Sequence, residues 1–363
     1  MRLILAGGGT FGHVGPLLAT AKELRRRDLD AQLRAVGTAE GLEAELVPAA
    51  GLELVIIPKV PLPRRPGGYA VRFPGLWMRA VASLRDLLAE FEPDAVVGFG
   101  GYVATPVYRV AAKAGLPIIV HEANARPGLA NRWGAARAAA VGVAFARTEL
   151  PGAKLVGMPL RSELARLDRD VSRPRARESL GLEPDRPTLL VSGGSLGAAN
   201  LNQAIVAVAG PLLAAGAQVL HLTGRGKAAP VARAVRGIDG AERFHVLEYL
   251  EEMEMALAAA DLAVQRAGAG AVSELACVGL PSVLVPLPVG NGEQRLNAVD
   301  LVEAGGAVLV QDGDFADWAA KNLVDLLTNP ERLALMAEAA RSVGIPDGAE
   351  RLADMIEQAV PGA

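Results

Sequence analysis

Short apolar runs alternate with longer amphipathic stretches along the whole chain. Apolar runs bounded by turn residues, with helical patterns of roughly 10 to 18 residues between them, are typical of βαβ units in a parallel sheet covered on both faces. The predicted strands cover residues 2–6, 31–36, 53–57, 95–98, 118–120, 140–143 and 154–156 in the first half, and 188–191, 217–222, 244–247, 262–265, 282–285 and 307–310 in the second.

The pattern restarts near the middle of the chain. Strand 2–6 is followed by a glycine-rich run at 7–12, strand 188–191 is followed by another at 192–197, and each run opens a helix. Two doubly wound α/β domains, at 1–157 and 158–344 with a hinge near Gly157, explain this restart most simply.

Composition agrees with two packed domains. The chain has 363 residues, 51% of them hydrophobic, and its one cysteine excludes a disulfide scaffold. The apolar start at 1–6 is too short for a signal peptide, and no run approaches the roughly 20 apolar residues of a membrane span. Residues 1–157 carry 19 lysines and arginines against 13 acidic residues, and the rest carries 18 against 27. The basic first half favours an anionic partner there, the alternative being drift in surface charge.

The two glycine-rich runs are candidate phosphate sites, because such turns present backbone N–H groups at the positive end of a helix. Residues 7–12 also fit the G-x-G-x-x-G pattern of nicotinamide enzymes. That function needs an acidic residue at the end of the second strand, where residues 35–38 read Ala-Val-Gly-Thr. We therefore set it aside. The remaining alternative is that both runs are tight turns that let helix pack on strand.

Seven short motifs, in family order and spanning nearly the whole chain, resemble those of the MurG family of nucleotide-sugar glycosyltransferases. They are GGTFGH at 8–13, GGYV at 100–103, HEAN at 121–124, GMPLR at 157–161, GGSLGA at 193–198, RAGAGAVSE at 266–274 and EQRLNA at 293–298. The chain departs from the family pattern at several positions that surround the donor sugar in the family, which leaves donor identity open. These departures include Phe11, Leu196, Gly270, Ala271 and Glu293.

The resemblance implies the GT-B fold, in which two Rossmann-like doubly wound α/β domains face each other across a cleft. It implies transfer of N-acetylglucosamine (GlcNAc) from UDP-GlcNAc to the N-acetylmuramic acid (MurNAc) of undecaprenyl-diphospho-MurNAc-pentapeptide (lipid I), with inversion, to give lipid II for peptidoglycan. The acceptor would bind the N-terminal domain and the donor the C-terminal domain, with helix 345–363 packing back on the N-terminal domain. The expected location is the cytoplasmic face of the plasma membrane, as a peripheral protein, and other cell-wall synthesis proteins are candidate partners.

Inverting transfer needs a base for the acceptor hydroxyl. His13 follows the first glycine run and starts a helix, so its ring is expected to face the ligand and to stay neutral. Glu122 follows strand 118–120 and is a rival base, which His121 would orient. The alternatives are a loop-packing histidine and a polar loop cluster.

The resemblance assigns the donor site residue by residue. Glu274 would accept the ribose hydroxyls, and Ser195 and Arg161 would hold the diphosphate. Gln294 would contact the sugar, and Asn297, also an expected donor contact, would hold that loop. A helix-dipole role for Glu274 and a surface position for Arg161 are the structural alternatives. The remaining expected donor contacts are Thr10, Gly12, Asn124, Gly268 and Ala269, and the acceptor or diphosphate side comprises Gly8, Gly9 and Tyr102.

We expect no metal and no other cofactor. Asp312-Gly313-Asp314 has the Asp-x-Asp spelling of metal-dependent glycosyltransferases, but its place after strand 307–310 favours an ordinary Asp-Gly turn. The four histidines are far apart and lack zinc spacing.

Residues 64–79 combine aromatic and basic side chains and predict a peripheral, salt-sensitive contact with an anionic membrane surface. The alternative is that Phe73 and Trp77 belong to the core. No nucleic-acid motif accompanies the basic residues, so we expect no nucleic acid partner. The predicted membrane patch is Arg72, Phe73, Leu76, Trp77 and Arg79.

Three other functions remain open. A related glycolipid glycosyltransferase would use another donor or another acceptor, such as diacylglycerol. A UDP-GlcNAc 2-epimerase would use a similar fold on a soluble substrate and would not need the membrane patch. A non-catalytic nucleotide-sugar binder would not need both His13 and Glu122.

Overall fold

The chain forms two α/β units, each built on its own parallel sheet. The computed structural model describes residues 1–363 except 64, 66, 195, 196, 290 and 361–363. The first unit comprises residues 1–161 and 347–363, and the second comprises 162–346. The first segment ends at Arg161 rather than at the expected Gly157 because Met158 and Leu160 are buried. The Met158 backbone also packs against Gly348, where an added Cβ would lie 2.4 Å from the Met158 carbonyl oxygen.

The sheet of the first unit has seven parallel strands in the order β3-β2-β1-β4-β5-β6-β7. The chain builds outwards from β1 to β3 and then returns to the other side of β1, so the strand order reverses between β1 and β4. Ligands of doubly wound sheets bind at the carboxyl ends of the strands beside such a reversal. The strands are β1 Arg2–Gly7, β2 Gln32–Gly37, β3 Glu53–Ile56, β4 Ala95–Gly100, β5 Ile118–Glu122, β6 Ala140–Val143 and β7 Ala153–Leu155.

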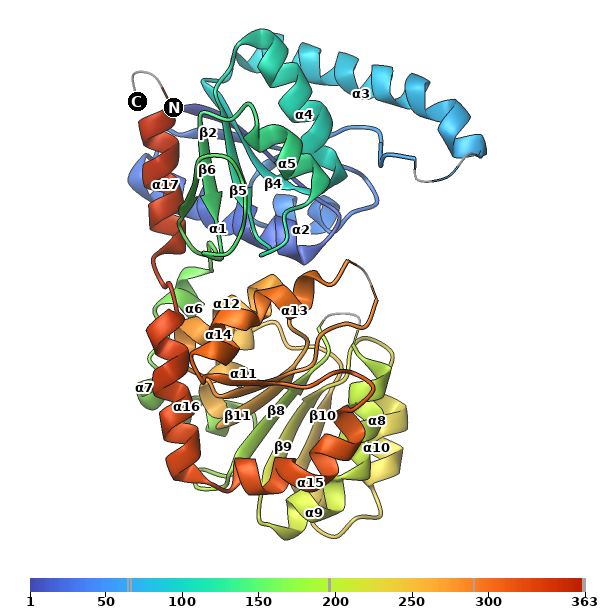
Figure 1. Ribbon diagram of the computed structural model, residues 1–363, viewed down its shortest axis with the longest axis vertical. Coiled ribbons are helices and arrows are strands. Elements are labelled where there is room, and N and C mark those ends of the chain that lie inside the picture. The colour runs from blue at the N-terminus through green and yellow to red at the C-terminus, as the bar shows by residue number, and fades with distance from the viewer. Residues whose placement is uncertain (64, 66, 195–196, 290, 361–363) are drawn as a thin grey trace. The chain divides into compact units, whose positions relative to one another are not determined.

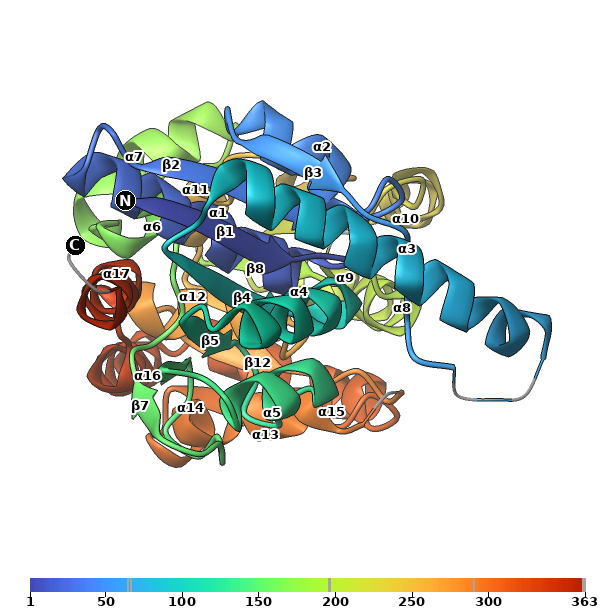
Figure 2. The same cartoon turned by 90° about the horizontal axis from the view of Figure 1, so that it is seen from above.

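Both faces of this sheet are buried. Leu3 and Leu5 of β1 point to the core under helices α1 and α17, and Ile4 and Ala6 point to the core under α3 and α4. Figure 2 shows α3 extending beyond the rest of this unit at its N-terminal end. The helices of this unit are α1 Phe11–Arg27, α2 Glu43–Ala49, α3 Gly68–Phe91, α4 Gly101–Ala114, α5 Leu129–Ala135 and α17 Gly348–Ala359.

Helix α17, at the C-terminal end of the chain, belongs to the first unit (Figure 1). Leu352 and Ile356 are fully buried in the core beside α1. Arg27 Nη1 donates to Asp354 at 2.6 Å and to Glu357 at 3.0 Å. An apolar stripe and an ion-pair cluster therefore attach this helix to α1.

We expect the α1 ion pairs to make stability depend on pH. Glu23 is 7% exposed and accepts from Arg26 and Arg27 at 2.7 Å each, and these bonds, that from Arg26 first, hold the pKa of its carboxyl at about 2. Because the pKa of Glu23 is lower in the folded state, its ionised carboxylate stabilises the fold at pH values above the unfolded pKa of about 4.5. This stabilisation is lost as the pH falls towards 2. After discounting for solvent screening, Glu23→Gln should cost about 1–2 kcal/mol at pH 7. Urea unfolding at pH 7, 4 and 3 should show the difference from wild type shrinking at the two lower values, and a constant difference would contradict this origin.

The second unit repeats the plan with six parallel strands in the order β10-β9-β8-β11-β12-β13. The order reverses between β8 and β11, and apolar residues of both strands, such as Val191 and Val264, form the core. The strands are β8 Thr188–Ser192, β9 Gln218–Leu222, β10 Phe244–Leu247, β11 Leu262–Gln265, β12 Ser282–Leu284 and β13 Ala307–Leu309. The helices are α6 Ser162–Ala165, α7 Arg169–Ser179, α8 Ala199–Ala207, α9 Ala209–Ala214, α10 Ala228–Val235, α11 Met253–Ala259, α12 Ala269–Val278, α13 Glu293–Asn297, α14 Val299–Glu303, α15 Phe315–Leu327 and α16 Pro330–Val343.

The predicted fold class is confirmed. Every predicted strand is present, with ends that differ by at most two residues, and all pairings between them are parallel. The prediction succeeded because strands buried on both faces appear in the sequence as continuous apolar runs.

Candidate functional site

His13 lies beside the first glycine run, at the carboxyl ends of β1 and β4. It is the third residue of α1, and its Nδ1 lies 3.1 Å from the Gly8 carbonyl oxygen and 3.4 Å from Thr10 Oγ1. Because a carbonyl can only accept, Nδ1 carries the hydrogen in this contact, and in the neutral ring Nε2 is then the acceptor. The ring is thus arranged for Nε2 to take a proton.

Gly100, the last residue of β4, and Gly101, the first residue of α4, make room for this ring. A Cβ on Gly100 would lie 3.2 Å from His13 Nε2, and one on Gly101 would lie 2.6 Å from the Gly8 carbonyl oxygen. Both residues have positive φ, of 97° and 77°. The GGYV motif at 100–103 therefore needs its two glycines, because the backbone there lies close to the first glycine run and to the His13 ring.

Sequence analysis missed Glu43, the first residue of α2, which is fully buried beneath the first glycine run. Its Oε2 accepts from the Gly9 backbone N–H at 2.8 Å, and its Oε1 accepts from the backbone N–H and the hydroxyl of Thr38 at 3.0 and 2.9 Å. Burial alone would raise the pKa of Glu43, but the hydrogen bonds from Gly9 and Thr38 outweigh burial, and the pKa is lowered. The carboxylate is therefore ionised at neutral pH.

Tyr102, expected on the acceptor side, joins this network. Its hydroxyl lies 3.1 Å from Thr38 Oγ1, and Lys59 Nζ lies 5.6 Å from the centre of its ring. Since the Thr38 hydroxyl hydrogen goes to Glu43, the Tyr102 hydroxyl donates to Thr38. The expected neighbours Thr10 and Gly12 are exposed at the start of α1, so they remain open to a ligand.

Glu122 is placed differently from what a general base requires. It is 3% exposed and accepts from the backbone N–H groups of Asn124 at 2.8 Å and Gly128 at 3.0 Å, and from Asn131 Nδ2 at 3.0 Å. Its carboxylate organises the loop after β5, and these three donors surround it. Asn124 Nδ2 also lies 3.4 Å from the Glu122 carboxylate. Asn124, which was expected to contact UDP-GlcNAc, is thus part of this loop network.

His121 does not orient Glu122 through its ring. Its Nε2 donates to the carbonyl of Gly157 at 3.0 Å, and burial lowers its pKa to about 4. The ring is therefore neutral and holds the segment before Arg161. Arg161, expected at the diphosphate, is half-buried at the end of this segment.

The second glycine run follows β8, at the strand-order reversal of the second unit. A Cβ on Gly197 would lie 2.0 Å from the Thr223 carbonyl oxygen, so only glycine fits there. The candidate diphosphate residue Ser195 and the departure Leu196 lie outside the described residues.

Helix α12 follows β11 through Gly268, its N-cap residue, and starts at Ala269. Glu274, the sixth residue of this helix, is half-buried in its second turn. The helix-dipole alternative acts mainly within the first turn and therefore fits Glu274 poorly.

Gln294 and Asn297 both hold loops. The side-chain oxygen of Gln294 accepts from the Leu287 N–H at 2.9 Å, which leaves its NH₂ group for a sugar hydroxyl. Asn297, expected as a donor contact, is fully buried, and its Nδ2 donates to the Ala267 carbonyl at 3.4 Å. Asn297 therefore positions the turn before α12 rather than reaching a ligand.

The Asp-x-Asp sequence is a turn before α15. Asp312 pairs with Arg266 at 2.5 Å and accepts from Asn200 at 2.6 Å. Among the described residues, no group of three or more histidine, cysteine or acidic side chains could hold a metal ion.

Sequence analysis also missed Arg225 and Tyr249, which follow β9 and β10 at the same edge of the second sheet. Tyr249 is half exposed, and the Arg225 guanidinium lies 5.5 Å from the centre of its ring. A tyrosine two residues after the predicted strand 244–247, in a chain with only 4% aromatic residues, was the available signal.

The rotation of α3 about its axis turns the apolar residues of the predicted membrane patch towards the core. Phe73, Leu76 and Trp77 are half-buried and pack on the core of the first unit. The exposed large apolar residues of this helix are instead Val71 and Met78, which are 81% and 66% exposed. They lie beside Arg72 and Arg79, which are exposed as predicted. None of the described helices is both long and apolar enough to cross a membrane.

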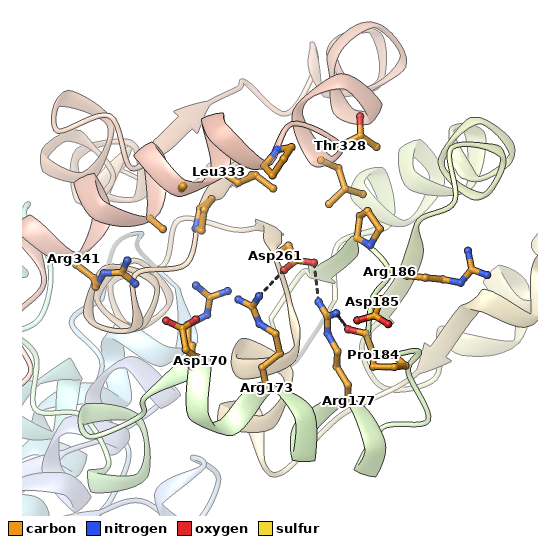
Figure 3. Close-up of a pocket in the computed structure, with 17 residues that line it drawn as sticks. Asp170, Arg173, Arg177, Pro184, Asp185, Arg186, Asp261, Thr328, Leu333 and Arg341 are labelled. Carbon is orange, nitrogen blue, oxygen red and sulfur yellow. Dashed lines mark hydrogen bonds and ion pairs between the residues drawn. The ribbon is translucent and has the colours of Figure 1, made fainter.

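A pocket of about 670 Å³ lies elsewhere in the second unit (Figure 3). Its wall includes Asp261 and Pro281, which directly precede β11 and β12, so it lies at the amino ends of the strands. Asp261 pairs there with Arg173 and Arg177. Ligands of doubly wound sheets bind at the opposite edge.

Two buried arginines of this pocket, Arg169 and Arg177, have structural partners. Arg169 donates to the carbonyls of Leu257, Ala260 and Gly279, and Arg177 donates to that of Ala259. Burial lowers the pKa of Arg169 to about 10. These side chains bind carbonyl groups at the carboxyl ends of α11 and α12, where cations are favourable.

Comparisons with known proteins agree with both units. The model of the glycosyltransferase family 28 N-terminal domain matches residues 3–143, and that of the C-terminal domain matches residues 188–352. The UDP-N-acetylglucosamine--N-acetylmuramyl-(pentapeptide) pyrophosphoryl-undecaprenol N-acetylglucosamine transferase of Clavibacter sepedonicus is 55% identical over 98% of this chain and 96% of that relative.

Solved structures are similar over nearly the whole chain. MurG of Acinetobacter baumannii has a TM-score of 0.79 and 28% identity, covering 98% of this chain and 99% of that one. The UDP-GlcNAc 2-epimerase of Neisseria meningitidis has a TM-score of 0.70 but 14% identity, covering 99% and 100%, and so shares the fold alone.

Two doubly wound units with glycine-rich turns at both strand-order reversals, together with these matches, define a glycosyltransferase of the GT-B fold. The chain belongs to glycosyltransferase family 28 and, within it, to the MurG family.

Proposed function

We propose that this protein transfers GlcNAc from UDP-GlcNAc to the MurNAc of lipid I, giving lipid II for peptidoglycan synthesis. The observation that carries the proposal is 55% identity, over nearly the full length of both chains, to a relative named for this reaction. The first and second units would contribute the acceptor side and the donor side, respectively.

In the proposed reaction, the MurNAc hydroxyl oxygen forms a bond to C1 of GlcNAc while the bond from C1 to the diphosphate oxygen breaks. UDP leaves, and attack from the opposite face inverts C1. His13 Nε2 takes the hydroxyl proton, in agreement with the contact from Nδ1 to Gly8. Glu122 stays a loop-organising residue, because three donors already surround its buried carboxylate.

We assign the donor to the carboxyl edge of the second sheet. Glu274 would accept the ribose hydroxyls, and the Gln294 NH₂ group would donate to the sugar. Arg161, Ser195 and the backbone at Gly268 and Ala269 would stabilise the diphosphate, so the reaction would need no metal. Tyr249 and Arg225 would contact the uracil ring by stacking.

A transfer assay tests this proposal. Purified protein is incubated with labelled UDP-GlcNAc and a short-chain lipid I analogue, with and without EDTA, and with UDP-glucose and UDP-galactose as competing donors. Label transfer that survives EDTA would support both the reaction and its metal independence. Transfer from another sugar nucleotide would instead support a related glycolipid transferase, and UDP binding without transfer would support a non-catalytic binder.

We also propose that α3 carries a peripheral contact with the cytoplasmic face of the plasma membrane. Val71 and Met78 lie seven residues apart, two helical turns, and therefore on one side of the helix, with Arg72 and Arg79 beside them. Exposed apolar groups can enter the interface, and each arginine near an anionic surface contributes about 1 kcal/mol.

Replacing both Val71 and Met78 with aspartate should weaken vesicle binding at least about tenfold, because it removes apolar area and adds negative charge near anionic lipid. Sedimentation with phosphatidylglycerol vesicles at low and high salt measures this effect. Leu29→Asp, at a 91% exposed leucine between α1 and β2, is the matched control. Equal binding of the double variant and wild type would place the membrane contact elsewhere.

A further inference from the structure

One peptide group connects the buried Glu43 to His13. The N–H of the Gly8–Gly9 peptide donates to Glu43 Oε2 at 2.8 Å, and the C=O of the same peptide lies 3.1 Å from His13 Nδ1. In a trans peptide the N–H and C=O point in opposite directions. A carboxylate that holds the N–H therefore also aims the C=O at the histidine.

We propose that Glu43 is a positioning residue that selects the tautomer of His13 through the Gly8–Gly9 peptide. The proposal rests on the proposed role of His13 as the base. Glycine on both sides of this peptide, with Gly9 at φ 92°, gives it freedom to rotate. Glu43 opposes that rotation because its carboxylate can only accept hydrogen bonds.

Rotation of this peptide would reverse the hydrogen bond to the ring. A flipped peptide would present the Gly9 N–H towards His13 instead of the Gly8 carbonyl. Nδ1 would then have to accept, which moves the ring hydrogen to Nε2. A ring with a hydrogen on Nε2 cannot take the acceptor proton there, so the peptide orientation controls the base.

The surroundings of Glu43 agree with a fixed, close-packed role. Added Cβ atoms at Gly8, Gly37 and Gly41 would lie 2.6, 2.4 and 2.0 Å from its side chain, so the backbone closes around it at three glycines. Its Oε1 takes both donors of Thr38. The carboxylate thus takes up the backbone N–H of Gly9 in the first glycine-rich turn. The Gly9 N–H is accordingly directed to the protein itself and not to a substrate diphosphate.

Glu43→Gln is the decisive variant because it keeps the shape of the side chain but replaces one acceptor oxygen with a donor NH₂. That group must face Gly9 or Thr38, each of which already donates. We expect kcat for transfer to fall about 10- to 100-fold, with the donor KM unchanged. Glu45→Gln, at an exposed position two residues along α2, is the matched control and should match wild type.

Two readouts separate positioning from mere loss of structure. In a His13→Ala background, Glu43→Gln should have no further effect on kcat, whereas a general structural defect would lower it again. In ¹⁵N-histidine NMR spectra, which contain only four histidines, His13 should change from Nδ1-protonated in wild type to Nε2-protonated or mixed in Glu43→Gln.

An unchanged His13 tautomer in folded Glu43→Gln would overturn the proposal, as would additive effects of the two substitutions. If Glu43→Gln fails to fold, Glu43→Asp is the second variant, because its side chain is one methylene shorter and withdraws the carboxylate from the Gly9 N–H. His13 should then be Nε2-protonated or mixed in the aspartate variant as well, and an unchanged tautomer there would contradict the proposal. The tautomer measurement does not need substrate. Failure of wild type to transfer GlcNAc would therefore refute the proposed function without deciding this inference.

Discussion

Replacing His13 with alanine will lower kcat for GlcNAc transfer by about 10²- to 10⁴-fold, the usual contribution of a positioned general base. The Nδ1 hydrogen is held by the Gly8 carbonyl, so Nε2 is the ring atom left to accept the acceptor proton. Donor binding should persist, because the ribose and sugar contacts that we assign, Glu274 and Gln294, belong to the second unit and His13 belongs to the first. Steady-state transfer and UDP binding by calorimetry measure the two effects separately.

Chemical rescue distinguishes a lost base from a distorted loop. Added imidazole should restore part of the activity of His13→Ala, because the missing ring leaves space at a site bordered by glycines. His245→Ala, at a half-buried histidine in β10, is the matched control and should not respond to imidazole. Nearly normal turnover of His13→Ala would assign the base role to another group and would reopen Glu122.

Replacing Glu274 with alanine will raise the donor KM by about 10- to 100-fold with little change in kcat, since hydrogen bonds to a charged group contribute roughly 1.5–3 kcal/mol. The residue lies in the second turn of α12, after the glycine turn that follows β11. A carboxylate there can accept both ribose hydroxyls of the donor. Initial rates over a range of UDP-GlcNAc concentrations give the two constants.

A modified donor makes this test specific to the ribose. Wild type should use the 2′-deoxyribose analogue of UDP-GlcNAc poorly, whereas Glu274→Ala should discriminate little between the analogue and UDP-GlcNAc. Glu338→Gln, at an exposed position on α16, is the control. If Glu274→Ala still prefers the full ribose as strongly as wild type does, the ribose contact lies elsewhere.

Much of the fold and part of the site could be read from the chain. The apolar runs gave the strands because burial on both faces removes polar residues from them. Glycines followed by a helix marked the turn that carries His13, since a backbone with positive φ or close contacts needs glycine. Apolar runs and glycine turns are signals that lie within short segments. The order of the family motifs along the chain then indicated the class of enzyme.

The roles of two carboxylates could not be predicted in this way. Glu40, Glu43 and Glu45 are equivalent candidates in the sequence, and only the packing of α2 against the first glycine run buries Glu43 against Gly9. Glu122 follows a strand as a catalytic group would, but Gly128 and Asn131, six and nine residues further on, surround its carboxylate.

The sequence by itself determined the two parallel sheets, the glycine turns and the class of enzyme, because each depends on residue patterns within a segment. The tertiary structure alone decided which side of α3 faces solvent, leaving Val71 rather than Phe73 exposed. It alone also showed that one peptide joins Glu43 to His13. The exposed side of α3 and the connection from Glu43 to His13 both depend on how segments that are distant in the sequence pack together. Burial and hydrogen bonding between such segments determine what each residue does, and the local sequence pattern does not.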